Sequence, residues 1–440
     1  MSDPTALPQP FVERVFGVRR DEFVAVAWSF VYFFCVLSSY YMLRSVREGM
    51  ATAVGASNVP WLFSGTFVAM LVIAPVFGLI ASRLPRRIFL PWVYFFFVLN
   101  ILAFRGLFAL FPEGTEYFSN VGVAFFIWLS VFNLFVVSVF WSFMADIYSK
   151  TQSRRLFGFI SAGGSAGSML GPGVSSLIVV PLGFENLLPI SACILLVAVI
   201  CIGRLKAWVA VEHEHDAQET VASGRALGGK WWTGIAAVFR EPYLVWMACG
   251  SVIASLMGTA LYIFNIELAG QYFDITDTRV QFFARLDFFT GALAFLAQLL
   301  VVRHSVSKLG VGITLALMPL LSIVGFSLLA ANPAFIVVAV LTVVRRALGF
   351  GLTKPTSDML YSVVPDEQKY KSKNFIDTAI YRGGDLFGAW TVRGMQTLGL
   401  GIAGIALVMV PVGLIWIGLA ILLGREYKRR DEAAGLKTAA

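Results

Sequence analysis

A succession of apolar segments, each long enough to cross a bilayer, constrains this chain more than any other feature. A membrane-spanning helix needs about 20 apolar residues. Twelve such segments can be marked along the 440 residues, at about 22–44, 60–82, 88–110, 121–145, 156–180, 187–203, 242–264, 280–302, 310–331, 334–361, 373–398 and 402–424. Hydrophobic residues make up 58% of the chain and charged residues only 14%, which is more apolar surface than a soluble globule can bury. We therefore predict an all-α membrane protein with twelve transmembrane helices.

Charges in the connecting loops predict the orientation of these helices. The loops on one side are rich in Lys and Arg, whereas the opposite loops carry mainly acids such as Glu113, Glu185 and Asp277. Basic loops are retained in the cytosol. We therefore expect a multi-pass protein of the bacterial inner membrane with both termini in the cytosol. The net charge of +8 reflects this topology, and we expect no nucleic-acid partner.

The longest hydrophilic stretch predicts the domain organisation. It covers residues 204–241 and separates six apolar segments from six others. We expect a cytosolic tail at 1–21, a six-helix bundle at 22–203, a cytosolic linker at 204–241, a second bundle at 242–424 and a cytosolic tail at 425–440. The protein is expected to be a monomer in the lipid bilayer.

Three features of the first half recur in the second half at similar offsets. Arg83 is followed by Arg303 after 220 residues, Asp146 by Asp358 after 212, and the Gly163-Gly164 pair by Gly383-Gly384 after 220. A shared offset indicates an internal repeat. Because each half has an even number of spans, the repeats have the same orientation, which predicts two pseudo-symmetric bundles.

Two segments resemble the major facilitator superfamily of transporters. Gly78-Leu-Ile-Ala-Ser82-Arg83-Leu-Pro85-Arg86-Arg87 resembles its loop signature Gly-x-x-x-Asp-x-x-Gly-Arg-Arg, with Ser82 in place of Asp and Pro85 in place of Gly. The glycine-rich segment with Gly163, Gly167 and Gly171 resembles the fifth helix of that superfamily. The resemblance implies the major facilitator fold and a gating role for Arg83, Arg86 and Arg87. Asp146 with Arg155 is a further candidate cytosolic gate.

The same glycines have a direct physical interpretation. Three glycines four residues apart lie on one face of a helix and allow another helix to approach closely. We expect this face to serve helix packing.

Two adjacent arginines lie deep in the tenth predicted span. Arg345 and Arg346 follow the start of that span by roughly 11 residues, or about 17 Å along a helix, near the middle of a hydrocarbon core about 30 Å thick. A charge at this depth costs about 2.5–3.5 kcal/mol even on a lenient scale. We expect one arginine to face a substrate pathway and the other to pair with an acid, with a purely structural ion pair as the alternative.

The eleventh span adds further charges. Arg382 precedes Gly383-Gly384, where a ligand can approach the backbone. Asp377 and Asp385 are expected to balance the cations or to couple transport to protons, and Glu267, at the expected end of span seven, is a third acid of this kind.

The spacing of the charges predicts two ion pairs within helices. Lys354 with Asp358, and Lys373 with Asp377, have the i, i+4 spacing of helical ion pairs. Pro355 is expected to loosen the helix next to the first pair.

The first bundle contributes fewer deep cations. Arg44 and Arg47 share one helix face at the expected end of the first span, and Arg285 lies early in the eighth. Anchoring at the outer interface is the alternative for the first two. Deep cations exceed deep acids, and the guanidinium group binds phosphate and carboxylate with two parallel hydrogen bonds. The residues therefore predict a small anionic solute, with Arg44, Arg47, Arg285, Arg345, Arg346 and Arg382 as binding candidates.

A second, more remote resemblance agrees with an anion. Tyr40-Tyr41-Met-Leu43-Arg44-Ser-Val-Arg47-Glu48 and Lys371-Ser-Lys373-Asn-Phe-Ile-Asp377 resemble segments of the ATP/ADP translocase family of plastids and intracellular bacteria. Arg47 replaces a substrate-binding Lys of that family, and an acid expected in helix four is absent. The resemblance implies nucleotide exchange.

The function predicted is secondary active transport of an organic, phosphate-bearing anion by alternating access, with ATP/ADP exchange as the leading specific expectation. A proton-coupled transporter of another small organic solute and a non-transporting receptor are the alternatives. The chain has no Walker loop and no His-Glu-x-x-His motif. The Glu212-His213-Glu214-His215 run could bind a metal, but a solvated linker is the expectation, so we expect neither an enzyme nor a cofactor or metal.

Overall fold

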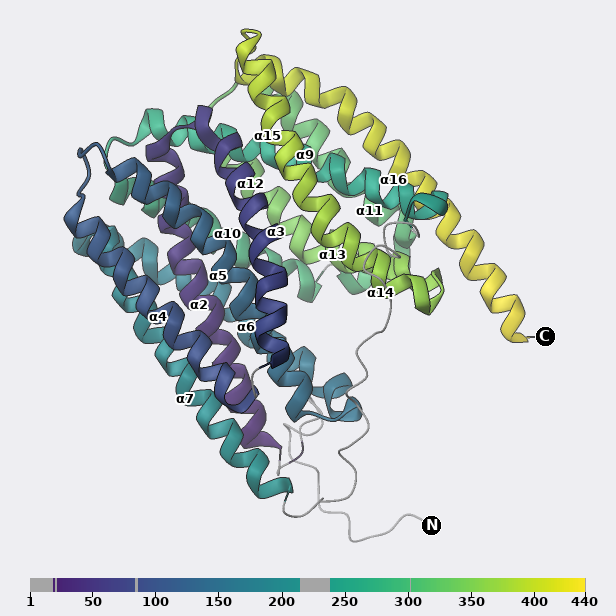
Figure 1. Cartoon of the computed structure of the whole chain (residues 1–440). Helices are drawn as coiled ribbons and strands as arrows, with labels where there is room; N and C mark the ends of the chain where they lie inside the picture. Colours follow the sequence, from purple (N-terminus) through teal and green to yellow (C-terminus); the bar gives the residue numbers. More distant parts are fainter. Residues whose placement is uncertain (1–18, 20–21, 84–85, 214–237, 301, 440) are drawn as a thin grey trace. The chain divides into compact units, whose positions relative to one another are not determined.

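The computed structural model describes residue 19 and residues 22–83, 86–213, 238–300 and 302–439. In these ranges the regular elements are helices and no strand occurs (Figure 1). The main helices are α2 (Phe23–Val54), α3 (Val59–Arg83), α4 (Arg86–Leu110), α5 (Phe118–Ile147), α6 (Lys150–Leu182), α7 (Leu187–His213), α9 (Pro242–Tyr272), α10 (Thr276–Leu300), α11 (Val302–Ala331), α12 (Phe335–Leu348), α13 (Lys354–Met359), α14 (Asp366–Phe375), α15 (Tyr381–Thr397) and α16 (Ile402–Ala439). Short turns join some of them, including the π-helical turns η3 (Gly349–Thr353) and η5 (Ile376–Ile380) and the 3-10 turn η4 (Leu360–Val363).

Eleven helical segments of the described chain are long and apolar enough to cross a membrane. The predicted span at 373–398 is helical through α14, η5 and α15, yet it is not among the eleven. Its charges, Lys373, Asp377, Arg382, Asp385 and Arg393, lower its mean hydropathy. The all-α, multi-span prediction is confirmed, and this polar helix is the element that hydropathy alone places least well.

The chain divides into two compact units. The first unit comprises Met1–Met50, Met70–Gly224 and Thr276–Phe288, and the second comprises Ala51–Ala69, Arg225–Ile275 and Phe289–Ala440. The end of α2 and the start of α3 therefore belong to the second unit, and the first half of α10 belongs to the first. The bundle boundaries at 203 and 242 stay a prediction, and residues 214–237 of the expected linker lie outside the described residues.

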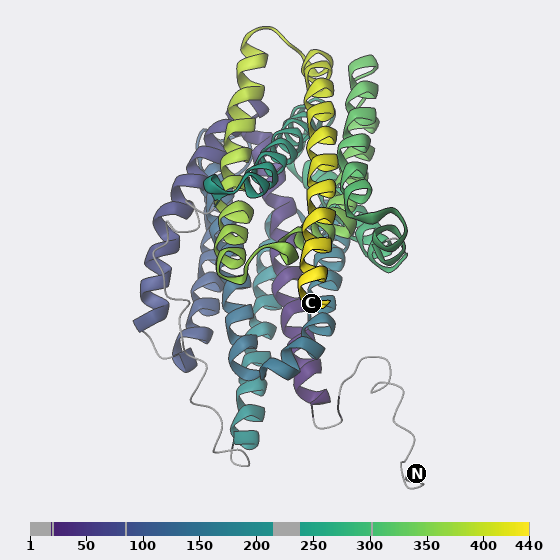
Figure 2. The ribbon, with the colours of Figure 1, turned by 90° about the vertical axis from the view of Figure 1, so that its right-hand side faces the viewer.

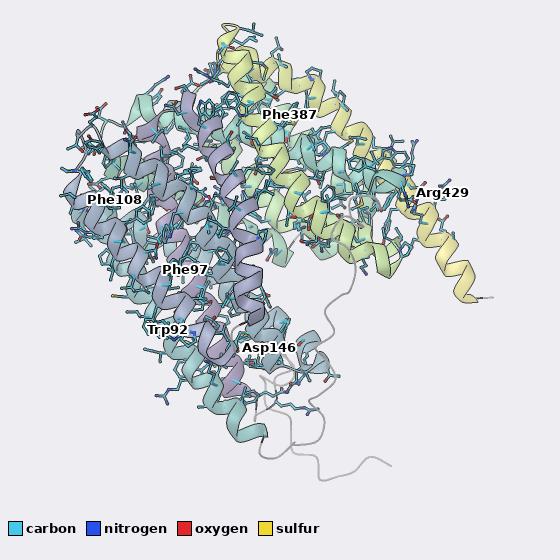
Figure 3. The ribbon with its side chains drawn as sticks, in the orientation of Figure 1. Trp92, Phe97, Phe108, Asp146, Phe387 and Arg429 are labelled. Atoms are coloured by element: carbon cyan, nitrogen blue, oxygen red, sulfur yellow. The ribbon has the colours of Figure 1, made fainter. Side chains whose placement is uncertain are left out.

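Aromatic side chains form much of the core of the first unit. Phe97 and Phe108 on α4 (Figure 3) contact Phe132 and Phe125 on α5, with ring centroids 5.0 and 5.7 Å apart. Such edge-to-face pairs are favourable beyond the area they bury. Helices α4 and α5 are therefore joined by interlocking rings.

Helix α6 packs against α2 through its glycines, as the sequence predicts. A Cβ atom added at Gly163, Gly167 or Gly171 would lie 2.3–2.5 Å from a backbone oxygen of α2. The three oxygens belong to Phe30, Phe34 and Ser38, respectively. No side chain fits at such distances, so the two backbones are in direct contact.

Close backbone contact also joins α11 to α16 in the second unit. A Cβ atom added at Gly312 would lie 2.9 Å from Cα of Gly424. Figure 2 shows α16, in yellow, running lengthwise beside a green helix of the same unit. Helix α9 packs against α15 at Gly384 and Gly388, where an added Cβ would meet α9 atoms at 3.0–3.1 Å. The contacts at Gly384 and Gly388 bring the charged helix α15 against α9.

Candidate substrate-binding site

Arg345 lies at the centre of the candidate site in the second unit. Among the described residues it is the only basic side chain that is buried, at 6% exposed. Its Nη2 donates a hydrogen bond to the carbonyl oxygen of Ala254 on α9 at 2.6 Å, and its Nε donates to Oγ of Ser322 on α11 at 3.2 Å. The guanidinium group is therefore held by two neighbouring helices.

A glycine on α9 makes room for this guanidinium group. A Cβ atom added at Gly258 would lie 3.0 Å from Nη1 of Arg345. Ala254 and Gly258 are one helical turn apart, so both face α12. Two small residues at this spacing create the space in which a long cationic side chain can lie flat against α9.

The partners of Arg345 are neutral. We expected one of the two adjacent arginines to pair with an acid; the ion pairs among the described residues do not include Arg345, and for Arg346 such a pair stays a prediction. The positive charge of a guanidinium group that has only neutral acceptors is not balanced by a nearby acid. In a medium of low dielectric constant, such a charge attracts anions strongly. Arg345 is thus the side chain whose environment most favours an anion.

Four other ionisable groups lie in the same region. Tyr381 on α15 lies within electrostatic range of Arg345, Arg346, Arg382 and Asp385. Arg382 is exposed and forms an ion pair with Asp385 at 3.6 Å, while Asp385 also accepts a hydrogen bond from Ser255 on α9. The structure therefore brings together the three second-half arginines that the sequence singled out and gives one of them an acid, as expected for Asp385.

Four charges on α13, α14 and η5 form crossed ion pairs. Lys354 binds Asp358 at 3.1 Å, which confirms the predicted i, i+4 pair, and also binds Asp377 at 2.6 Å. Lys373 binds Asp358 at 2.9 Å in place of the Asp377 expected within its own helix. The prediction that Pro355 loosens its helix is confirmed by the π-helical turn η3, which ends at Thr353.

Glu267 lies inside α9, which runs to Tyr272, and not at the end of its span as predicted. Its carboxylate accepts a hydrogen bond from Nε2 of Gln396 on α15 at 3.2 Å, and no ion pair with a described Lys or Arg involves it. A half-buried carboxylate with a neutral partner is a group that can exchange a proton during transport.

Arg44 and Arg47 are neutralised by acids of the first unit. Both lie inside α2, which continues to Val54, ten residues beyond the predicted end of the span. Arg44 forms ion pairs with Glu48 at 3.5 Å and with Asp287 on α10 at 3.6 Å, and Arg47 also pairs with Glu48. Two cations thus face two buried acids. Arg285, two residues before Asp287, is exposed.

The predicted gating residues are only partly described. The side chains of Arg83, Arg86 and Arg87 lie outside the described residues, and Asp146 is exposed at the end of α5 (Figure 3). Arg155 on α6 forms an ion pair with Glu22 at 2.6 Å. The sequence did not point to Glu22, because it lies at the polar start of α2, where a solvated acid is the ordinary expectation.

The pKa of Glu22 is set by two opposing effects. Burial raises it, but hydrogen bonds from Arg155, from the Gln152 amide and from the backbone N–H of Arg19 lower it more, so the pKa falls below its ordinary value of 4.5. A depressed carboxylate pKa stabilises the fold above the ordinary pKa, and this stability is lost as the pH falls through the lowered value.

We therefore expect the difference in Tm between the wild type and Glu22→Gln to be constant near neutral pH. It should shrink as the pH falls below about 4.5. Thermal unfolding in detergent across this pH range measures it, with the exposed Glu116→Gln as the control. A difference that does not change with pH would contradict the assignment.

Two residues that contact the candidate arginines were not chosen as candidates from the sequence. Ser322 looks like an ordinary polar residue of an apolar helix, and Asp287 lies two residues from the selected Arg285. An acid in an apolar segment is costly, and this cost was the one available signal for Asp287.

Three features agree with a multi-pass membrane transporter of a small solute. They are the apolar helices that can cross a membrane, the charged side chains that face one another inside a helical unit, and the internal repeat in the sequence. The chain belongs to the Major Facilitator Superfamily, whose sequence profile matches residues 28–389. This confirms the resemblance of its loop and glycine motifs.

Individual proteins are similar to it at low identity. ADP,ATP carrier protein 2 of Chlamydia pneumoniae is 22% identical, over 96% of this chain and 92% of that protein. The crystal structure of the nucleoside transporter NupG matches with a TM-score of 0.60 and 15% identity, covering 94% of this chain and 99% of that one. A bacterial homologue of the iron transporter ferroportin, crystallised in an inward-facing state, has a TM-score of 0.64 and 10% identity, covering 92% and 98%. These structures establish the fold, and the proteins that share it are transporters rather than enzymes.

Proposed function

We propose that this protein exchanges phosphate-bearing organic anions across the bacterial inner membrane, with nucleotides such as ATP and ADP as the leading substrates. The observation that carries the proposal is Arg345, a buried guanidinium group whose described partners are all neutral. The proposal includes a monomer with both termini in the cytosol, an orientation that the loop charges support.

The charge balance of the second unit supports an anionic substrate. Lys354, Lys373 and Arg382 each have a carboxylate partner within 3.6 Å, whereas Arg345 has none among the described residues. A transported anion that reaches this guanidinium group offsets the cost of the buried charge, and two parallel hydrogen bonds to a phosphate give it a defined orientation.

Arg346 and Arg382 are the further binding candidates in this unit, because both lie in electrostatic range of the same tyrosine as Arg345. A nucleotide carries several negative charges, which suits a group of three arginines better than a monocarboxylate does. Arg44 and Arg47 can take part only when the anion replaces one of their acids, Glu48 or Asp287.

The similarity to ADP,ATP carrier protein 2 supports nucleotides over other anions. It extends over nearly the whole of both chains, and it agrees with the motif resemblance around Arg44 and Lys373. Because the name of that relative includes both ADP and ATP, exchange of one nucleotide for the other is the transport mode that we propose.

Proton-coupled transport of another organic solute is the second candidate. Glu267 favours it, because a carboxylate with a neutral amide partner can be protonated at little cost in lost ion pairing. In that case Glu267, with Asp385 and Asp377 as alternatives, is the group that carries the proton.

A reconstitution experiment distinguishes the two. Proteoliposomes are loaded with ADP, and the uptake of labelled ATP is measured with and without a pH gradient, in parallel with inorganic phosphate, nucleosides and organic acids. We expect saturable ATP uptake that requires internal ADP and persists without the gradient. Uptake that requires the gradient favours proton coupling. The absence of saturable flux for every phosphate-bearing anion would overturn the proposal.

A further inference from the structure

A cavity of about 100 Å³ lies within the second unit, beside the crossed ion pairs. Its walls are formed by α9, α11, α13 and α16 together with the turns η3, η4 and η5. The side chains that give it polar character are Ser251, Thr353, Ser357, Tyr361 and Asp377, and the rest of the lining is largely apolar and includes Trp416.

Two hydroxyl groups in this lining are buried without a hydrogen-bond partner among the described residues. They are the phenol oxygen of Tyr361, a residue that is 2% exposed, and Oγ1 of Thr353. Burying an unpartnered hydroxyl costs free energy. The neighbouring Tyr243 shows the usual solution, since its hydroxyl donates to the carbonyl oxygen of Leu360 at 3.0 Å. Unlike Tyr243, Tyr361 thus has a hydroxyl group that is left for whatever occupies the cavity.

The charge of the cavity wall selects the class of ligand. The lining contains one carboxylate, that of Asp377, and neither Lys nor Arg. Lys354 is bound to Oδ2 of Asp377 at 2.6 Å, which leaves Oδ1 available. A carboxylate oxygen accepts hydrogen bonds or coordinates cations and never donates when ionised, so an anion is disfavoured at this wall.

The number of charges limits the ligand further. The crossed pairs comprise two lysines and two aspartates, whose formal charges cancel. Because these charges cancel, the wall has no excess negative charge to balance a divalent ion, and a monovalent cation is the most that Oδ1 of Asp377 can hold beside Lys354. Carboxylate and hydroxyl oxygens are ligands that suit hard cations.

Both of the π-helical turns in this unit contribute to the cavity. Thr353 is the last residue of η3, and Asp377 is the second residue of η5. Such turns within longer helices are frequent at functional sites, and interrupted helices supply the ion sites of many secondary transporters. The local backbone therefore agrees with the charge and the unpartnered hydroxyls.

We propose that this cavity binds a monovalent metal cation, for which Na⁺ is the probe, through Asp377 and the hydroxyl groups of Tyr361 and Thr353. Ser251 and Ser357 supply further hydroxyl oxygens from α9 and α13. Arg345 does not line the cavity, although it donates a hydrogen bond to the carbonyl oxygen of the lining residue Ala254.

Cation binding is measured on the full-length protein in detergent by thermal unfolding during a titration with NaCl, with choline chloride keeping the ionic strength constant. We expect Na⁺ to raise Tm by a few degrees in a saturable manner. Tyr361→Phe and Asp377→Asn should each move the half-saturating Na⁺ concentration upward by about tenfold or more. Equal Tm values in Na⁺ and choline would overturn the proposal, and so would unchanged midpoints in both variants, which would indicate that the cavity holds water.

Two matched variants control for general damage. Tyr243→Phe removes a partnered tyrosine hydroxyl, and Asp358→Asn removes the acid of the crossed pairs that does not line the cavity. Both are expected to lower Tm at every Na⁺ concentration. The midpoint should stay unchanged in Tyr243→Phe, and it should move by less in Asp358→Asn than in Asp377→Asn, because Asp358 acts on the site only through Lys354 and Lys373. A midpoint shift in Asp358→Asn as large as in Asp377→Asn would contradict the position of the site. Because the readout is binding and not flux, its result stands apart from the outcome of the nucleotide assay.

Discussion

Replacing Arg345 with methionine is expected to abolish saturable anion transport, with a loss of at least about a hundredfold in kcat/KM, while leaving the protein as stable as the wild type or more so. A buried charge without an acid partner is costly, by about 2.5–3.5 kcal/mol even on the lenient insertion scale. Methionine fills a similar volume without that cost. Loss of transport with unchanged or increased stability would indicate that Arg345 serves function at the expense of stability.

The groups that Arg345 leaves behind keep other partners. Ser322 Oγ also donates to the carbonyl oxygen of Met318 at 2.9 Å, and the Ala254 carbonyl lies inside α9, where helical hydrogen bonding continues. Removing the guanidinium group thus strands no buried polar group, which is the usual reason for instability after such a change.

The measurement pairs proteoliposome uptake with thermal unfolding of the same preparations. Arg345→Lys keeps the charge but cannot bridge Ala254 and Ser322 together, so we expect it to recover only part of the activity. Arg429→Met, at an exposed position on α16 (Figure 3), is the control and should transport normally. A methionine variant that unfolds readily would show instead that Arg345 is a structural residue.

Substituting Gly167 by alanine is expected to cost about 2–3 kcal/mol or more of folding stability. The added Cβ would lie 2.3 Å from the carbonyl oxygen of Phe34 and 3.0 Å from the backbone nitrogen of Ser38. Backbone atoms of α2 cannot rotate away as a side chain does. The helices must therefore separate, and Gly163 and Gly171 lose their contacts at the same time.

Gly158→Ala is the matched control on the same helix, because no atom lies within 4 Å of its added Cβ. Alanine is favoured over glycine inside a helix by about 1 kcal/mol, so this variant should be slightly more stable. Thermal unfolding of both variants in one detergent makes the comparison. Equal Tm values for the two would show that α2 and α6 are not in backbone contact in the folded protein.

Features that depend on one helix at a time could be predicted from the sequence. Hydropathy located the apolar spans, a spacing of four placed Gly163, Gly167 and Gly171 on one face, and the same spacing paired Lys354 with Asp358. Each follows from the pitch of the α-helix and the thickness of a bilayer, quantities that do not depend on the other helices.

Which charges neutralise one another was decided only by the tertiary structure. Arg345 and Arg346 are adjacent and chemically identical, yet only Arg345 is buried against α9 and α11 with neutral partners. Lys373 binds Asp358 rather than Asp377, and Arg44 is balanced by Asp287, far away in the chain. The physical reason is that periodicity shows which residues share a face, whereas the rotation of each helix about its axis, set by packing against its neighbours, decides which partner that face meets.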